Sequence, residues 1–373
     1  MLMQAAVLRH PSAAGLLIES VTLDNPRERE VLVQVQASGI CHSDYHYLTG
    51  TLPLPSARIL GHEVSGTVIE VGDKVSAFAP GDRVVACLAM ACGSCPECAV
   101  GWPNLCSRRI ELTQRPQSEP PRIIGTDGSP ITAGSGIGGF APYALIDERG
   151  LVAIPDWMPF APAALLGCGV LTGTGAVFRT ARVRPGSSVA VIGCGGVGLS
   201  IIQAARISGA SSIFAIDRSD GRLSAAMQLG ATDTFLVGSD STTVVEFIHG
   251  ATEGRGVNYA FEAVGTAETV RDAFMSLGPK GVATIVGIFP EGAEITIPAR
   301  HIVSGERRLQ GSYMGSSLLR RDILELCQLY KTGQLRLDEM IDPILALEEV
   351  SQGFSLMSRA EGLRPMIGFG ADT

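Results

Sequence analysis

The pattern of apolar and polar residues changes character once along the chain. Over residues 28–37 (EREVLVQVQA) apolar and polar side chains alternate, which is the period of a half-buried β-strand. The segments GTVIEVG and DRVVAC, further along, are short apolar runs of the same kind, and glycine and proline separate them. These patterns predict that roughly the first 150 residues are rich in strands and loops.

A different rhythm begins after Pro185-Gly186. The segments SSVAVIG, SSIFAID, TFLVG, GVNYAFEAVG and KGVATIVGI are short and apolar, and helix-length stretches separate most of them. Strands that alternate with helices are typical of βαβ units around a parallel sheet. A helical segment, LLRRDILELCQLYKTG, starts near residue 318 and leads into a mixed tail. We therefore expect two domains, with boundaries at 170–186 and at 310–315.

Composition narrows the class of protein. The chain has 373 residues, which is long enough for two domains and a large core. No apolar run approaches the ~18 residues that span a bilayer, and the start MLMQAAVLRHPSAAG lacks the organisation of a secretory signal, so we expect neither membrane insertion nor export. The net charge is −8 without a lysine- or arginine-rich block, which argues against a nucleic-acid surface but allows a small anionic ligand.

The most legible motif is a glycine pattern between a strand and a helix. Gly193, Gly195 and Gly198 form G-x-G-x-x-G after the apolar run VAVI. In this context the glycines permit a tight turn, close approach of a pyrophosphate, and packing of the helix on the strand. Asp217 ends the next strand 19 residues after Gly198, where a carboxylate binds ribose hydroxyls and repels a 2′-phosphate, so NAD is favoured over NADP. Arg218 weakens this preference, and the competing interpretation is a glycine-rich turn without a ligand.

Four of the nine cysteines are closely spaced. Cys92, Cys95, Cys98 and Cys106 give C-x2-C-x2-C-x7-C, and four thiolates complete the tetrahedron of a structural zinc ion. An iron–sulfur cluster is the main alternative, because C-x2-C-x2-C also begins ferredoxin-type sites. Proline follows Cys95 rather than the last cysteine, and a second cysteine set is missing, so zinc is favoured.

A second candidate metal site is scattered along the chain. Cys41, His62 in GHE and Cys168 in LLGCGVLTG are three nitrogen or sulfur ligands that leave a fourth zinc position open, as in catalytic sites. Cys168 is equally compatible with a buried core thiol, and His62 with a core histidine. His42 and His46 are spaced i, i+4, so on a helix they compete as ligands.

Taken in order, these motifs resemble one family. GICHSD, GHEVSGTVIEVG, the four-cysteine lobe, GCGVLTG and VIGCGGVGLS…AID are similar to the zinc-dependent medium-chain alcohol dehydrogenases over nearly the whole chain. The resemblance implies an α/β fold: a GroES-like β-barrel catalytic domain of residues 1–169 and 314–373, and a Rossmann coenzyme domain of residues 170–313. A cysteine in GCG as third zinc ligand is similar to alcohol dehydrogenases rather than to polyol dehydrogenases, which use a glutamate. The long segment between Cys106 and Phe140 resembles the dimeric branch of the family.

The resemblance also implies roles for individual residues. Cys41, His62 and Cys168 would bind the catalytic zinc, and the four clustered cysteines a second, structural zinc. Asp44 would orient the zinc-bound histidine, and Glu63 would lie behind the metal. Ser43 and His46 match the family's proton relay, in which the zinc-bound alcohol loses its proton through Ser43, the nicotinamide ribose and His46.

Cofactor and substrate contacts follow in the same way. His42 and Arg364 match contacts to the pyrophosphate, and Arg222 matches a basic position beside the adenosine ribose. Further positions similar to cofactor contacts are Thr172, Gly196, Val197, Val264, Val286 and Ile288. Positions similar to the substrate-pocket lining are Leu52, Leu88, Ile288 and Tyr313.

The expected activity is reversible hydride transfer between NAD and a primary alcohol. An apolar pocket favours a medium-chain, allylic or aromatic alcohol over a polyol. S-(hydroxymethyl)glutathione dehydrogenase is the alternative and takes second place, because the loop YLTGTLPLPSAR carries none of the acidic residues that recognise glutathione. A zinc-free quinone reductase and a non-catalytic relative are further alternatives, which the complete ligand and relay sets oppose. We expect a cytoplasmic homodimer with no nucleic-acid or membrane partner.

Overall fold

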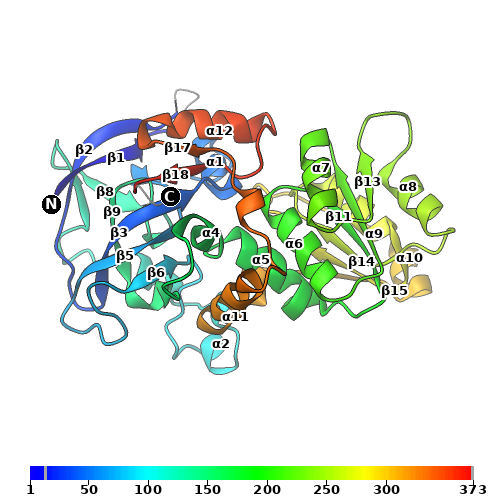
Figure 1. The fold of residues 1–373 in the computed structure, drawn as a ribbon, viewed down its shortest axis with the longest axis horizontal. Coiled ribbons are helices and arrows are strands. Elements are labelled where there is room, and N and C mark those ends of the chain that lie inside the picture. The colour runs from blue at the N-terminus through cyan, green and yellow to red at the C-terminus, as the bar shows by residue number, and fades with distance from the viewer. Residues whose placement is uncertain (12–14, 371–373) are drawn as a thin grey trace.

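The computed structural model describes residues 1–11 and 15–370, which form two bodies side by side along the long axis of the molecule (Figure 1). Both ends of the described chain lie in the first body, with most of the antiparallel strands. The second body contains a parallel sheet with helices on its faces. No helix in the described ranges is long and apolar enough to span a membrane.

The first body is built from a closed barrel and a second sheet. The barrel has the order β1-β2-β7-β8-β4, with β1 (Leu2–Leu8), β2 (Leu17–Leu23), β7 (Ile123–Gly125), β8 (Pro130–Ala133) and β4 (Arg58–Ile59). The second sheet has the order β10-β6-β5-β3-β18-β17, with β9 also pairing β3; its strands are β10 (Leu151–Ala153), β6 (Arg83–Ala86), β5 (Glu63–Val71), β3 (Glu30–Gly39), β18 (Met366–Gly368), β17 (Ile344–Leu345) and β9 (Tyr143–Asp147). The chain start is therefore strand-rich, as the sequence predicts, and the C-terminal strands complete its sheet.

The strand β3 differs from its prediction in one respect. Its alternating pattern predicts one buried and one exposed face, but most of its residues are buried. Leu32 packs into one hydrophobic cluster, while Val31, Val33 and Val35 pack into another. The expectation of half-burial is wrong because β3 is central in the first body, with β5, β9 and β18 paired to it and hydrophobic clusters on both faces.

The second body is a parallel six-stranded sheet of order β13-β12-β11-β14-β15-β16. Its strands are β11 (Ser188–Ile192), β12 (Ser212–Asp217), β13 (Asp233–Leu236), β14 (Val257–Glu262), β15 (Leu277–Ile285) and β16 (Arg308–Gly311). The helices that connect them are α6 (Gly196–Ile207), α7 (Asp220–Leu229), α8 (Val244–Ala251), α9 (Ala267–Met275) and α10 (Ala299–Gly305). The five predicted apolar segments are strands, but β16 was not predicted, because RLQG is short and mostly polar.

Side chains of these elements belong to two hydrophobic clusters, one on each face of the parallel sheet. In β11, Val189 and Val191 pack into one hydrophobic cluster, whereas Ala190 and Ile192 pack into the other. Burial on both faces is what parallel sheets with βαβ crossovers require, and it explains the continuous apolar run that the sequence shows.

The two bodies meet around α5 (Gly169–Gly175), which two other segments approach closely. A Cβ at Gly173 would lie 2.5 Å from the carbonyl oxygen of Val197 in α6, and one at Gly175 would lie 2.4 Å from that of Gly315. Only glycine admits backbones this close. Gly315 belongs to the turn that leads from β16 into α11 (Leu319–Lys331), which packs against α5. The glycines of α5 thus allow both α6 of the second body and the turn that leads back to the first body to pack closely on this helix.

Candidate active site

Three of the predicted metal ligands converge between the two bodies. The ligand atoms of Cys41, His62 and Cys168 all lie within 4.8 Å of one another, and all three residues are buried. Cys41 precedes α1 (His42–Leu48), His62 precedes β5, and Cys168 precedes α5. Neither His42 nor His46 belongs to this cluster of candidate ligands, although α1 carries both.

Contacts among these groups and with Asp44 shift their pKa values. A hydrogen bond from the Cys168 thiol lowers the pKa of Cys41 well below its ordinary value, and the same bond raises the pKa of Cys168. Burial alone would lower the pKa of His62, but Asp44 and the Cys41 thiolate raise it well above the ordinary value. Metal ligands must lose these protons, so metal binding here releases protons.

The donor set fits zinc. His62 Nδ1 lies 3.2 Å from Asp44 Oδ1, while His62 Nε2 is buried and has no hydrogen-bond partner in the described chain. An imidazole that donates from one nitrogen to a carboxylate presents the other to a metal. Asp44 also accepts hydrogen bonds from the backbone of Gly61 at 3.1 Å and of Cys41 at 3.4 Å, so one carboxylate positions two of the three ligand segments.

Behind this cluster is a buried ion pair whose two residues, Glu63 and Arg364, come from distant parts of the chain. Arg364 Nε donates to Glu63 Oε2 at 3.1 Å, and its Nη2 donates to Oε1. Glu63 Oε1 also accepts from the backbone of Gly169 at 2.9 Å, next to Cys168. Burial raises the pKa of Glu63, while Arg364 opposes that rise. On its other side the guanidinium faces the glycine loop, since a Cβ at Gly196 would lie 2.8 Å from Arg364 Nη1.

The predicted relay residues lie on α1, beside the metal ligands. Ser43 Oγ is 3.8 Å from Cys41 Sγ. His46 is half-buried, its ring centroid lies 5.2 Å from that of His42, and desolvation lowers its pKa below the ordinary value. No direct hydrogen bond joins Ser43 to His46 in the described chain, so a proton passing between them needs an intervening hydroxyl. Tyr45, between them, packs on Phe354.

The four-cysteine lobe has the dimensions of a mononuclear metal site. The sulfur atoms of Cys92, Cys95, Cys98 and Cys106 all lie within 4.8 Å of one another, and Cys95 and Cys106 are 3.8 Å apart. A tetrahedron with bonds of about 2.3 Å separates its sulfurs by about 3.8 Å. Backbone N–H groups of Ser94 and Cys95 point at Cys92 Sγ, and hydrogen bonds to this sulfur, that of the Ser94 N–H first, lower the pKa of Cys92 to about 6. An iron–sulfur cluster would hold the four thiolates further apart, so the geometry favours zinc.

The glycine loop has the shape that a dinucleotide requires. Gly193 adopts a positive φ of 92°, at the turn after β11. A Cβ at Gly195 would meet nothing within 4 Å, so the backbone there is open to a ligand. A Cβ at Gly198 would lie 1.8 Å from the carbonyl oxygen of Gly193, so only glycine permits this packing of α6. The exposed N–H groups and dipole of α6 then face the position of a phosphate.

Asp217 ends β12 beside this loop. Its Oδ2 accepts from Cys194 N at 2.7 Å, and its Oδ1 accepts from the backbones of Arg218 and Ser219 at 2.7 and 3.0 Å. The carboxylate is thereby fixed in orientation while remaining partly exposed. Arg222 is close by on α7, and its Nε is buried without a hydrogen-bond partner in the described ranges.

Other predicted cofactor contacts surround the loop. Thr172 lies in α5 and donates to Met314 Sδ at 3.7 Å, while Val197 lies in the first turn of α6. Val264 and Ile288 are exposed, and Val286 is half-buried. All three follow the carboxyl ends of β14 and β15, the edge at which parallel sheets bind their ligands.

Of the predicted pocket residues, Tyr313 has partners that sequence reasoning missed. Asn104 Nδ2 donates to the Tyr313 carbonyl at 2.9 Å, and the Arg109 guanidinium donates to its hydroxyl and lies 5.4 Å from its ring centroid. Asn104 lies within the four-cysteine lobe, between Cys98 and Cys106, and Arg109 follows that lobe. Leu52 and Leu88 are half-buried, and the latter packs against the cluster that includes Cys41 and Cys168. These contacts join residues that are 204 and 209 positions apart in the chain, so no local sequence pattern predicts them.

Comparison with known proteins agrees with this arrangement. Residues 27–156 match the Alcohol dehydrogenase GroES-like domain, and residues 196–332 match the Zinc-binding dehydrogenase family. Alcohol dehydrogenase B of Mycobacterium tuberculosis is 33% identical over 95% of each chain, and S-(hydroxymethyl)glutathione dehydrogenase of Paracoccus denitrificans is 34% identical over 94% of this chain and 96% of its own. The crystal structure of benzyl alcohol dehydrogenase from Acinetobacter calcoaceticus superposes with a TM-score of 0.90 at 30% identity, covering 99% of this chain and 100% of that one.

The chain therefore belongs to the zinc-dependent medium-chain alcohol dehydrogenase family. It is an oxidoreductase with a GroES-like domain and a Rossmann domain, as the sequence predicts. Its two Cys/His clusters are the places where zinc fits.

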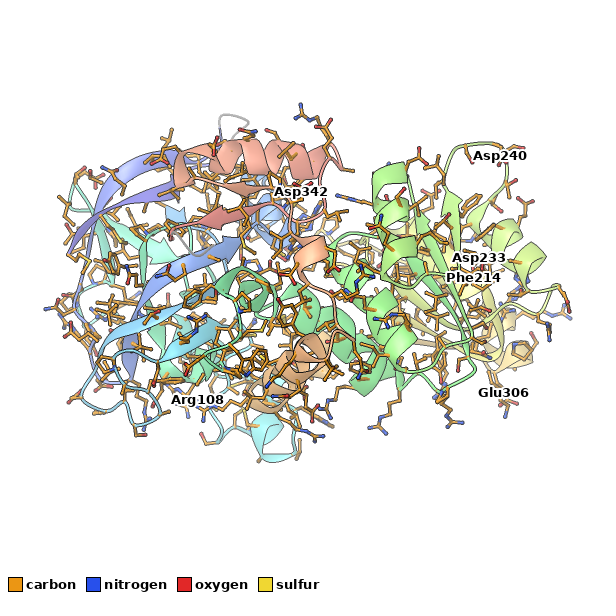
Figure 2. All side chains as sticks on the ribbon, viewed as in Figure 1. Arg108, Phe214, Asp233, Asp240, Glu306 and Asp342 are labelled. Atoms are coloured by element: carbon orange, nitrogen blue, oxygen red, sulfur yellow. The ribbon has the colours of Figure 1, made fainter. Side chains whose placement is uncertain are left out.

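Asp44 provides a test of the metal site. Asp44→Asn should weaken zinc binding at the Cys41 cluster by about 10- to 100-fold, because the amide orients His62 less well. Competition with a chelator, followed by metal analysis, measures this. Asp240→Asn is the control, since Asp240 is exposed, accepts from the backbone of Thr242 and lies in the second body, between β13 and α8 (Figure 2). Equal zinc retention in the wild type and Asp44→Asn would contradict the role of Asp44.

Proposed function

We propose that this chain oxidises primary alcohols with an aromatic, allylic or medium-length apolar body, with NAD as the acceptor and zinc held by Cys41, His62 and Cys168. This proposal depends on one buried ion pair that contacts both the candidate metal site and the glycine loop. The Glu63–Arg364 pair contacts the backbone next to Cys168 and also lies against the glycine loop at Gly196. A metal-bound substrate and a dinucleotide would thereby be held in one frame, as hydride transfer requires.

The chain's own residues supply positioning and proton transfer. When bound, zinc acts as a Lewis acid on the alcohol oxygen and the nicotinamide accepts hydride. Ser43, next to Cys41, is placed to accept the alcohol proton, and His46, one turn along α1, is placed to pass it towards solvent. A ribose hydroxyl of the cofactor would connect these two side chains, which share no direct hydrogen bond in the described chain. The lowered pKa of His46 keeps its imidazole neutral and able to accept the proton at neutral pH.

NAD is the proposed cofactor rather than NADP. The carboxylate of Asp217 is fixed by three backbone N–H groups at the end of β12, where it would bind ribose hydroxyls and repel a 2′-phosphate. Burial lowers the pKa of His42, so this residue would bind the pyrophosphate as a neutral hydrogen-bond donor, while Arg222 and Arg364 would provide positive charge for the ribose and the pyrophosphate. Thr172 and Val197 would pack on the nicotinamide, and Val264, Val286 and Ile288 are further proposed cofactor contacts.

An apolar substrate fits the proposed pocket residues Leu52, Leu88, Ile288 and Tyr313. The similarity to a structure of benzyl alcohol dehydrogenase favours an aromatic alcohol. S-(hydroxymethyl)glutathione is the second candidate, because a relative of comparable identity carries that name. The loop from Tyr47 to Arg58 has no acidic residue to bind glutathione, which places this substrate second.

We also infer a homodimer in the cytoplasm. The edge strand β16 pairs only with β15 in the described chain, and Ile302, Val303 and Leu309 near it are exposed by 46%, 81% and 41%. A strand whose outer edge is unpaired and has apolar neighbours suits a second copy of the same edge. All nine cysteines are free, and the six that are proposed as metal ligands need the reducing conditions of the cytoplasm.

Substrate and cofactor can be tested together. Zinc-loaded protein should turn over benzyl or allylic alcohols faster with NAD than with NADP, and faster than S-hydroxymethylglutathione. Steady-state rates with matched concentrations of each alcohol and cofactor measure this. Turnover with the glutathione adduct alone would replace our substrate assignment, and preference for NADP would refute the role of Asp217.

The relay predicts a specific pH dependence. Because desolvation lowers the pKa of His46, the acidic loss of kcat should fall below the ordinary imidazole range of about 6.5. His46→Gln should remove that ionisation from the pH–rate profile. Ser43→Ala should reduce kcat by about 100-fold at unchanged zinc content. Near-normal turnover of Ser43→Ala would remove Ser43 from the relay.

The dimer can be tested at the edge of the sheet. Val303→Asp should convert the dimer to a monomer, since a charge beside β16 opposes burial of this surface. Light scattering after size-exclusion chromatography measures the mass. Val100→Asp is the matched control, because Val100 is exposed by 63% in the other body. A wild-type monomer, or an unchanged dimer in Val303→Asp, would contradict this interface.

A further inference from the structure

Glu262 is a buried carboxylate for which the proposed mechanism has no role so far. It is the last residue of β14, at the carboxyl end of the parallel sheet, and its exposed fraction is 0%. No arginine, lysine or histidine of the described chain lies within ion-pair distance of it, in contrast to Glu63, which pairs with Arg364. Burying a carboxylate without a counter-ion is costly, so a residue of this kind needs compensating hydrogen bonds or a function.

One oxygen of Glu262 holds the turn that follows β14. Its Oε1 accepts from Val264 N at 2.7 Å, from Gly265 N at 2.6 Å and from Thr269 Oγ1 at 2.8 Å. Thr269 in turn bonds to Thr266, the capping residue of α9. Three donors on one oxygen fix the path of the chain from the strand into the helix.

The backbone carbonyl of Glu262 also binds the segment that follows the neighbouring strand, β15. The Glu262 carbonyl accepts from Val286 N at 2.9 Å and from Gly287 N at 3.2 Å, just after β15. A Cβ at Gly287 would lie 2.6 Å from Glu262 Oε2, and a Cβ at Gly265 would lie 2.3 Å from the carbonyl oxygen of Ile288. The two strand ends are therefore packed together over the carboxylate, at distances that only glycine allows.

The turn held in this way also touches the first glycine of the phosphate loop. Ala263 N donates to the Ile192 carbonyl at 2.9 Å, at the end of β11. A Cβ at Gly193 would lie 2.7 Å from Val264 Cγ2. Glu262 thus connects the ends of three adjacent strands. The segments that it holds carry Val264, Val286 and Ile288, the positions proposed to contact the cofactor.

The second oxygen, Oε2, is buried and has no hydrogen-bond partner in the part of the chain that the structure describes. The three bonds require only an acceptor at the position of Oε1, so the amide oxygen of a glutamine in place of Glu262 would accept them as well. Loss of the acceptor, in contrast, leaves three donors at the cofactor edge unsatisfied and frees the turn.

We propose that Glu262 is a positioning residue for the dinucleotide, which fixes the Ala263–Gly265 turn and the Val286–Ile288 segment against the glycine loop. This inference rests on the proposed function, since it requires the chain to bind NAD(H). Glu262 acts through Val264, Val286 and Ile288, and no hydrogen bond or ion pair joins it to a metal ligand in the described chain.

The test compares Glu262→Leu with Glu262→Gln. Because each unsatisfied donor weakens the organised site, Glu262→Leu should raise the Kd for NADH about 10-fold, whereas Glu262→Gln should keep it within about 3-fold. NADH fluorescence titration measures both, with thermal melting to show that each variant folds. KM for the alcohol at saturating cofactor should change less than the Kd for NADH in both variants. Zinc content should stay that of the wild type.

Two further variants sharpen the result. Thr269→Val removes one of the three donors and should raise the Kd for NADH by a smaller factor, which supplies an answer if Glu262→Leu does not fold. Asp233→Asn is the control: this acid lies at the opposite, amino end of the same sheet, beside Phe214, where its loss should leave NADH binding unchanged (Figure 2).

The outcomes separate this inference from the proposed function. NADH binding by wild type with equal affinity in folded Glu262→Leu would overturn the role of Glu262 and leave the proposed function intact. A parallel rise of alcohol KM and NADH Kd would also overturn it, because general loosening would then explain both. A wild type that binds no NADH would remove the proposed function, and this inference with it.

Discussion

The arrangement of the two sites depends on one buried ion pair. Glu63 and Arg364 are 301 residues apart in the chain, yet their side chains bond twice in a region from which water is largely excluded. Removal of one partner would leave an uncompensated buried charge, which costs about 3–5 kcal/mol. The pair also bonds the first backbone N–H group of α5, that of Gly169, and faces the glycine loop. The C-terminal segment therefore closes the frame that holds the metal ligands and the cofactor site together.

Around this pair, α5 is the element that both sites share. Cys168 precedes it and Thr172 lies within it, while Gly173 and Gly175 admit α6 and the return segment at close range. The first residues of α5 and α6, Gly169 and Gly196, both lie against the Arg364 guanidinium, since a Cβ at these glycines would lie 3.2 and 2.8 Å from its nitrogens. The segment that carries Cys168 and the glycine loop are therefore packed on the same side chain.

The sequence predicted well those features that depend on local spacing. The glycine loop, the four-cysteine lobe and the strands of the parallel sheet each follow from residues close together in the chain, because their chemistry needs fixed intervals. The convergence of Cys41, His62 and Cys168 was implied by family resemblance, since spacing cannot bring distant segments together. Strand β16 was missed because four mostly polar residues give no periodicity, and the full burial of β3 was missed because the strands and clusters that cover it come from distant parts of the chain.

Other parts of the site had no signal in the sequence at all. Asn104 and Arg109 touch Tyr313 through contacts that only the folded chain creates. Glu262 is one glutamate at the end of an apolar strand, and its environment alone distinguishes it from the other acids. Burial, orphaned polar atoms and long-range contacts are properties of three-dimensional packing, so they became visible only in the structure.

The contacts from the four-cysteine lobe to Tyr313 have a consequence for how this enzyme can change. The residues that would bind the catalytic metal precede α1, β5 and α5, and many of those that would bind the cofactor lie at the carboxyl ends of the parallel strands, whereas Tyr313 of the proposed pocket is braced by the four-cysteine lobe and its flank. Substitutions at Asn104 or Arg109 can reshape that wall without touching a ligand or the relay. The part of the proposed pocket at Tyr313 can therefore vary while the candidate metal ligands and relay residues are kept.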